Sequence, residues 1–225
     1  WEFIRLACHD NLNLKIITTH AGFVGKDGST HHALEDISLM ATLPNLGILI
    51  PSDEPELIQM LDYALTTEGP FYIRLPRVQF PTIHKEDYVF SPEKPNLLKN
   101  GKKICLIGSG YGTHLALECA KMIEEKYHIS IKVLNLPSVK PIDPNALVKE
   151  MEQIKTLITI EEHHSYNGIG SIVARLVSDK IPKIIQSIGI EANFGQSGKR
   201  EDLLRAYGLN CENIIKTIEK IIDFN

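Results

Sequence analysis

One glycine-rich stretch, residues 19–32, concentrates more reactive side chains than any other segment of the chain. It reads T-H-A-G-F-V-G-K-D-G-S-T-H-H, so three histidines and one aspartate lie within fourteen residues, among three glycines that allow tight turns. The β-branched run at residues 14–18 predicts a strand before it, and helical spacing of apolar residues predicts a helix from about Thr30. The stretch, called the histidine loop below, therefore leaves the carboxyl end of a strand, where open α/β sheets bind ligands.

The polar side chains of the histidine loop, His20, Asp27, His31 and His32, fit three interpretations. They could bind a metal, because imidazole and carboxylate suit zinc or iron, although the loop has no cysteine and no helical i,i+4 histidine pair. They could also satisfy carbonyl groups of the loop itself. We favour a third interpretation, a polar substrate site. Neutral imidazoles donate hydrogen bonds and shuttle protons near neutral pH, and a carboxylate accepts from a hydroxyl group.

The first third of the chain alternates strands and helices. Strands are predicted at residues 45–50 and 71–74, and the helix between them begins after Asp53 and ends before Gly69-Pro70. This order predicts a parallel sheet covered by helices. Three strands are half of a usual doubly wound sheet, and the chain does not start with methionine, so we expect the other half of this domain to precede Trp1.

The pattern changes after residue 78. Residues 79–100 contain prolines and mixed charges without periodicity, which predicts a linker. We therefore divide the chain into residues 1–78, the second half of one α/β domain, the linker 79–100, and a further α/β domain at residues 101–225. Strands of this further domain are predicted at residues 103–107, 131–136, 156–160 and 183–188, with helices between them.

Composition excludes several classes of partner. The formal charge is −4 and no run of basic residues occurs, so we expect neither nucleic acid nor a membrane surface to be bound. The four cysteines are widely spaced without a C-x-x-C pair, which argues against zinc and a disulfide framework and favours a cytoplasmic location. No apolar run is long enough for a membrane helix.

Three further groups end predicted strands. For Arg74 we expect a surface salt bridge. The glycine-rich run at residues 108–113 could cradle a phosphate, but we favour tight packing of a helix on a strand. The run E-E-H-H at residues 161–164 could form a metal or acid/base site, and we favour polar loop residues at a domain or subunit contact.

Ordered motifs along the whole chain carry a family resemblance. The histidine loop continues to T-H-A-G-x-x-G-x-D-G-x-T-H-H-x-x-E-D, and the motifs K-P-I-D (residues 140–143), E-E-H (161–163) and F-G-Q-S-G (194–198) follow it. Together they resemble the transketolase family. The resemblance implies a partial pyrimidine-binding, parallel-sheet domain followed by the transketolase C-terminal α/β domain.

The resemblance also implies roles for single residues. His20 and Asp27 match residues that face the donor ketose, and His31 matches a histidine that lines the same channel. His32 is similar to its counterpart in deoxyxylulose-phosphate synthases, and Arg77 matches an arginine that meets the sugar phosphate. We therefore expect His20 and His31 to be catalytic, and Asp27, His32 and Arg77 to bind the substrate.

The implied reaction is ketol transfer between sugar phosphates with thiamine diphosphate and magnesium. Deoxyxylulose-phosphate synthesis remains an alternative, as does a non-catalytic assembly subunit. The family places the diphosphate motif and the activating glutamate in an earlier segment, so we expect the cofactor to be held largely by an N-terminal transketolase subunit or segment. A homodimer or heterotetramer is expected, with no metal site in this chain itself.

Overall fold

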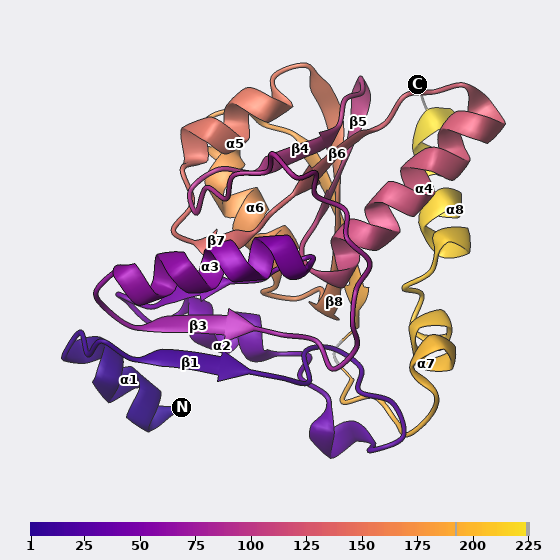
Figure 1. Ribbon diagram of the computed structural model, residues 1–225. Helices are drawn as coiled ribbons and strands as arrows, with labels where there is room; N and C mark the ends of the chain where they lie inside the picture. Colours follow the sequence, from indigo (N-terminus) through magenta and orange to yellow (C-terminus); the bar gives the residue numbers. More distant parts are fainter. Residues whose placement is uncertain (192, 224–225) are drawn as a thin grey trace.

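Two β-sheets flanked by helices make up the computed structural model, which describes residues 1–191 and 193–223 (Figure 1). The first sheet has the strand order β1-β3-β2-β7. Its strands are β1 (Lys15–Thr18), β2 (Gly47–Leu49), β3 (Phe71–Arg74) and β7 (Ser138–Lys140). The first three run parallel, as the alternating pattern predicts, whereas β7 pairs with β2 in the antiparallel sense. The later part of the chain therefore completes the β2 edge of this sheet.

Helices accompany the first sheet at α1 (Glu2–His9), α2 (Asp36–Ala41) and α3 (Glu54–Thr66), with a 3₁₀ turn, η1 (Ser29–His31), in the histidine loop. α3 begins as predicted because the side chain of Asp53 accepts a hydrogen bond from the Glu56 N–H at 3.1 Å. Thr67 follows its last turn, ahead of Gly69-Pro70.

The helix after the histidine loop starts later than predicted. Only the single turn η1 forms near Thr30, and α2 begins at Asp36. Ala33 explains the delay, because its C=O accepts from the Gly22 N–H at 2.9 Å and its N–H donates to the Gly22 C=O at 3.2 Å. This pairing closes the histidine loop on itself and uses backbone groups that a helix would need.

The second sheet has the order β4-β6-β5-β8-β9, and β4 is its antiparallel edge strand. Its strands are β4 (Asn96–Lys99), β5 (Lys103–Gly108), β6 (Lys132–Asn135), β8 (Ile154–His164) and β9 (Ile184–Ile190). Its helices are α4 (Tyr111–Tyr127), α5 (Pro144–Met151), α6 (Ile169–Ser178), α7 (Arg200–Ala206) and α8 (Cys211–Asp223). The linker prediction missed β4, because a four-residue strand carries too little periodicity to detect.

Apolar cores cover both faces of the second sheet. One cluster joins Ile48 and Tyr72 of the first sheet to Leu147 of α5 and Val173 of α6, so the two sheets share a core. On the opposite face α4 and α8 lie side by side and bury a second cluster that includes Ile218 (Figure 1). The mainly parallel sheets with their helices confirm the predicted α/β class.

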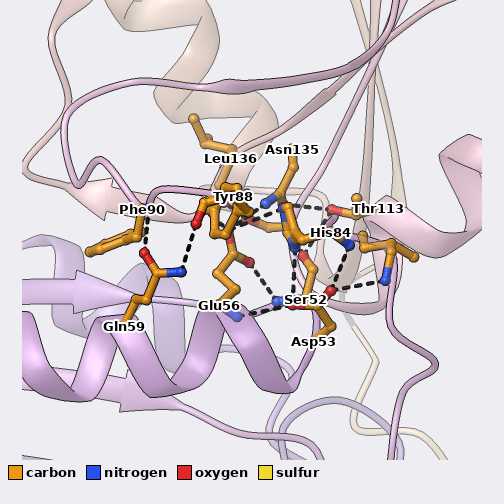
Figure 2. A network of polar contacts seen from close by, with 12 residues as sticks. Ser52, Asp53, Glu56, Gln59, His84, Tyr88, Phe90, Thr113, Asn135 and Leu136 are labelled. Carbon is orange, nitrogen blue, oxygen red and sulfur yellow. Dashed lines mark hydrogen bonds and ion pairs between the residues drawn. The ribbon is translucent and has the colours of Figure 1, made fainter. Parts of the chain in front are cut away.

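A buried polar network also joins the sheets (Figure 2). Asn135 at the end of β6 donates from Nδ2 to Glu56 Oε1 at 2.8 Å, and the Tyr88 hydroxyl donates to the same oxygen at 2.6 Å. His84 Nδ1 lies 2.9 Å from Asp53 Oδ1. Burial raises the pKa of the Glu56 carboxyl above its ordinary value. His84 and Tyr88, which the sequence places in the linker, thus belong to the packed interface between the two sheets.

In the described part of the chain, no helix has the length and apolar character needed to span a membrane.

Candidate active site

The histidine loop leaves the first sheet at the carboxyl end of β1, beside the end of β3. Its start is fixed by the Ala21 N–H, which donates to the Leu75 C=O at 3.0 Å. His20, directly before this bond, has a φ of 71°, in the left-handed region that non-glycine residues seldom adopt. Its ring Nδ1 lies 2.7 Å from Thr19 Oγ1, and its side chain is partly exposed. The surrounding bonds therefore hold a strained residue at the strand edge, which is typical of functional sites.

Asp27 and Arg77 lie together on the open side of the loop. They form an ion pair, with 41% of the Asp27 side chain and 49% of the Arg77 side chain exposed. His31 is exposed as well, and its Nδ1 lies 3.1 Å from Thr30 Oγ1. Among the described residues no hydrogen bond or ion pair joins His31 to Asp27 or Arg77. Of the predicted site residues, the structure therefore brings Asp27 and Arg77 into contact. The side chains of Asp27, His31 and Arg77 are all exposed.

His32 is placed differently from the other loop residues. It is buried, its Nδ1 accepts from the Val24 N–H at 3.2 Å, and its Nε2 lies 3.0 Å from the Gln196 C=O. The two contacts assign the tautomer with hydrogen on Nε2, since one nitrogen must accept and the other must donate. Its ring also packs edge-on against Phe23, with centroids 5.1 Å apart. Both ring nitrogens are thus used inside the chain, which favours a supporting role for His32.

A buried ion pair from the second sheet anchors the histidine loop. Glu162 of β8 accepts from the Phe23 N–H at 2.9 Å through Oε1 and from Arg200 Nη2 at 2.6 Å through Oε2. A side chain at Gly22 would collide with Glu162, because a Cβ there would lie 2.2 Å from its carboxyl carbon. Burial raises the pKa of the Glu162 carboxyl, while the Arg200 guanidinium and the Phe23 N–H oppose that shift. The absence of a side chain at Gly22 therefore leaves the space that the Glu162 carboxylate of the second sheet occupies.

Residues 194–198, which precede α7, pack against the histidine loop. The Ser197 hydroxyl donates to the Lys26 C=O at 2.7 Å. Gly195 has a φ of 78°, and a Cβ there would lie 2.9 Å from the ring of His32. The motif F-G-Q-S-G, distant in sequence, is therefore a structural neighbour of the histidine loop.

The expectation of a surface salt bridge at Arg74 is wrong in one respect: the bridge exists but is buried. Arg74 Nε donates to Asp36 Oδ2 at 2.7 Å, and the Tyr72 hydroxyl donates to the same oxygen at 2.8 Å. Although burial acts in the opposite direction, Arg74 holds the pKa of the Asp36 carboxyl below its ordinary value. Arg74 Nη2 also donates to the Glu162 C=O at 3.1 Å. Arg74 is therefore committed to the interface between the sheets, whereas Arg77 is exposed and paired with Asp27.

The E-E-H-H run lies within β8 and not in a loop. Glu161 caps α6 by accepting from the Ile169 N–H at 2.5 Å and the Gly170 N–H at 3.1 Å, and burial raises its pKa to about 8. Burial also lowers the pKa of His163 to about 4, so its ring is neutral near pH 7. The expected contact between structural units is present, but through buried strand residues. The sequence did offer a signal for this contact, namely two adjacent glutamates directly after a predicted apolar strand. A carboxylate that is buried needs a partner, which another part of the chain must supply.

The described residues contain no group of three histidine, cysteine, aspartate or glutamate side chains arranged to hold a metal ion. The glycines at residues 108–113 pack a helix tightly on a strand, as the sequence favours: a Cβ on Gly112 would lie 2.0 Å from the Ile160 C=O. Gly112 therefore serves the close approach of α4 to β8.

Two family models match the chain in sequence order. Residues 1–82 match the transketolase pyrimidine binding domain, and residues 93–214 match the transketolase C-terminal domain.

Individual relatives carry the same similarity. The chain is 33% identical to one of the subunits of the apulose-4-phosphate transketolase of Actinobacillus succinogenes, covering 92% of this chain and 68% of that one. It is 34% identical to a putative transketolase C-terminal section of Methanocaldococcus jannaschii, and the match covers 97% of this chain and 69% of that one. A 1-deoxy-D-xylulose-5-phosphate synthase of Clostridium tetani is 33% identical, and 98% of this chain spans 36% of that enzyme.

Among solved structures, a split-gene transketolase described as an inactive beta4 tetramer superposes with a TM-score of 0.90 at 36% identity. The match covers 97% of this chain and 70% of that one.

Proposed function

The chain belongs to the transketolase family as a carboxyl-terminal section, and from this premise we propose that it takes part in transferring a two-carbon ketol unit between sugar phosphates. The observation that carries the proposal is the contrast at the strand edge. His32, Arg74 and Glu162 are buried and use their polar atoms inside the chain, whereas Asp27, His31 and Arg77 are exposed and His20 is partly exposed. The buried residues hold the loop and the accessible ones can meet a substrate.

Each accessible group suits one part of a ketose phosphate. Asp27 accepts a hydrogen bond from a sugar hydroxyl, and the Arg77 guanidinium binds a phosphate through two parallel N–H donors. These two side chains are paired with each other in this structure, so substrate binding exchanges their ion pair for contacts with the sugar. His20 and His31 position the carbonyl and hydroxyl oxygens and carry protons at their ring nitrogens.

Thiamine diphosphate, the cofactor of this family, supplies the electron sink that cleavage beside a ketone requires. The family places the diphosphate motif and the activating glutamate in an earlier segment, so we propose that another polypeptide or segment holds most of it. The split-gene relative supports this division of labour, because its tetramer of one subunit type is described as inactive. We infer that an N-terminal transketolase subunit is the partner and that the working enzyme is an oligomer.

Deoxyxylulose-phosphate synthesis is the second candidate. The His31-His32 pair favours it, as does the similarity to the Clostridium tetani enzyme. Ketol transfer is preferred because the relatives of matching extent are transketolase sections and because F-G-Q-S-G, a transketolase-like motif, contacts the histidine loop. A non-catalytic assembly subunit is less favoured, since such a subunit would have no chemical need for His20, Asp27 and Arg77 at one strand edge.

A comparison of substrate pairs on the reconstituted enzyme tests the proposal. Xylulose phosphate with ribose phosphate should give product, and pyruvate with glyceraldehyde phosphate should not. The reverse result would establish the deoxyxylulose-phosphate alternative, and no turnover of either pair by a cofactor-loaded complex would favour the assembly subunit.

A further inference from the structure

Two cysteines meet between α4 and α8, on the face of the second sheet opposite to α5 and α6 (Figure 1). Cys119 Sγ lies 2.9 Å from Cys211 Sγ, although 92 residues separate them in sequence. A disulfide has its sulfur atoms about 2.05 Å apart, so a shift of under about 1 Å would join them. We propose that Cys119 and Cys211 form a reversible disulfide, and that this pair is a redox modification site for a peroxide.

The surroundings assign different roles to the two thiols. Cys119 is fully buried, and its S–H donates to the Cys211 sulfur. The hydrogen bond to Cys211 and burial raise the pKa of the Cys119 thiol, so Cys119 stays protonated. Cys211 is partly exposed and is the first residue of α8. Cys211 is therefore the sulfur that meets an oxidant, and Cys119 is the resolving thiol.

An open groove lies one helical turn from the pair. It has a volume of about 580 Å³ and lies between the same two helices. Met122 of α4 lines it one turn after Cys119, and Ile215 of α8 lines it one turn after Cys211. The other two cysteines lack such a position, because Cys8 and Cys105 are both buried, and neither has a sulfur partner among the described residues. The proposal therefore concerns one pair only.

The reaction balances with one peroxide molecule. The Cys211 sulfur attacks a peroxide oxygen and the O–O bond breaks, which yields a sulfenic acid at Cys211 and, with hydrogen peroxide, one water. Cys119 then attacks the Cys211 sulfur, the S–O bond breaks, and hydroxide leaves with the Cys119 proton as a second water. The two sulfurs are oxidised and the peroxide is reduced. A dithiol such as dithiothreitol reverses the step by exchange.

The direct test is a thiol count on the whole chain after treatment with one equivalent of hydrogen peroxide. Titratable thiols in denaturant should fall from four to two, because the four free cysteines lose one pair. The mass should fall by two hydrogens, and a peptide containing Cys119 should be linked to one containing Cys211. The closed loop of 92 residues should raise the melting temperature by roughly 10 °C, and dithiothreitol should reverse every change.

Two variants and one control keep the test decisive. In Cys211→Ser and in Cys119→Ala, peroxide should no longer remove two thiols together. In the control variant Cys8→Ala it still should. Because Cys211 is partly exposed, its variant should fold even if Cys119→Ala does not. Accumulation of sulfinic acid at Cys211, cross-linking between chains, or an unchanged thiol count would each overturn the proposal.

Discussion

Replacing Glu162 by glutamine tests whether a buried ion pair from the second sheet holds the histidine loop. The exposed fraction of the side chain is 4% for Glu162 and 13% for Arg200, and their N–O distance is 2.6 Å. Removing one partner of a buried pair typically destabilises a protein by about 3–5 kcal/mol. Glutamine replaces the charged acceptor of the Phe23 N–H by a weaker neutral one, and Arg200 can turn toward solvent, so we expect the lower end, about 3 kcal/mol. For a chain of this size the melting temperature should fall by roughly 6–12 °C.

The measurement is urea unfolding at pH 7, with hydrogen exchange at the Phe23 amide as a local readout. Asp179→Asn is the matched control, because Arg175 and Asp179 also lie 2.6 Å apart but are 75% and 71% exposed. Its effect should stay below about 0.5 kcal/mol. Equal losses of stability in the two variants, or unchanged exchange at Phe23 in Glu162→Gln, would refute the anchoring role.

Three further predictions concern the substrate site and the buried carboxylates. In the reconstituted enzyme, Arg77→Ala should raise KM for phosphorylated donors by about one to two decades, since a charge-assisted hydrogen bond is worth roughly 1.5–3 kcal/mol. KM for unphosphorylated donors should rise far less. Equal changes in the KM of both donor types, measured by steady-state kinetics, would exclude a phosphate contact. Asp27→Ala should relax discrimination between donor ketoses that differ at the hydroxyl next to the carbonyl, and an unchanged ranking of donors would return Asp27 to a role in the loop. The pKa of Glu161 is raised from 4.5 to about 8 in the folded chain, so the unfolded state releases its proton first and this contribution to stability is lost as pH rises between those values. The unfolding free energy of the wild type should therefore fall relative to that of Glu161→Gln by at most about 1.4 kcal/mol per pH unit in this window, and parallel pH profiles in urea titrations would contradict that pKa.

Local sequence patterns sufficed to predict much of the first sheet. The strand at residues 71–74 and the cap at Asp53 follow from a short apolar run and from a side chain that bonds three residues ahead. They depend on neighbours in sequence, which is why they could be predicted. The same holds for the strand edge that presents His20 and Arg77, because both closely follow predicted strands.

Features that depend on distant partners were missed. β7 adds to the first sheet through β2, and the Ser138 hydroxyl that bonds the Ile48 C=O lies 90 residues later in sequence, so nothing near Ser138 indicates that pairing. Arg74 could not be distinguished from a surface arginine without the position of Asp36 and of the second sheet. The supporting contacts of His32 likewise come from Gln196, which is 164 residues away. The sequence identified reactive groups, and only the fold separates those that are buried and hold the loop from those that are exposed.

The most direct test of the account is a ketol transfer assay on three samples with thiamine diphosphate and magnesium: this chain alone, an N-terminal transketolase subunit alone, and their mixture. Turnover of xylulose phosphate and ribose phosphate should occur only in the mixture. His20→Ala should abolish it while leaving the mass of the complex in analytical ultracentrifugation unchanged. Turnover by the isolated chain, or full activity of a mixture that contains His20→Ala, would contradict the claim that this chain supplies the substrate side of a shared active site.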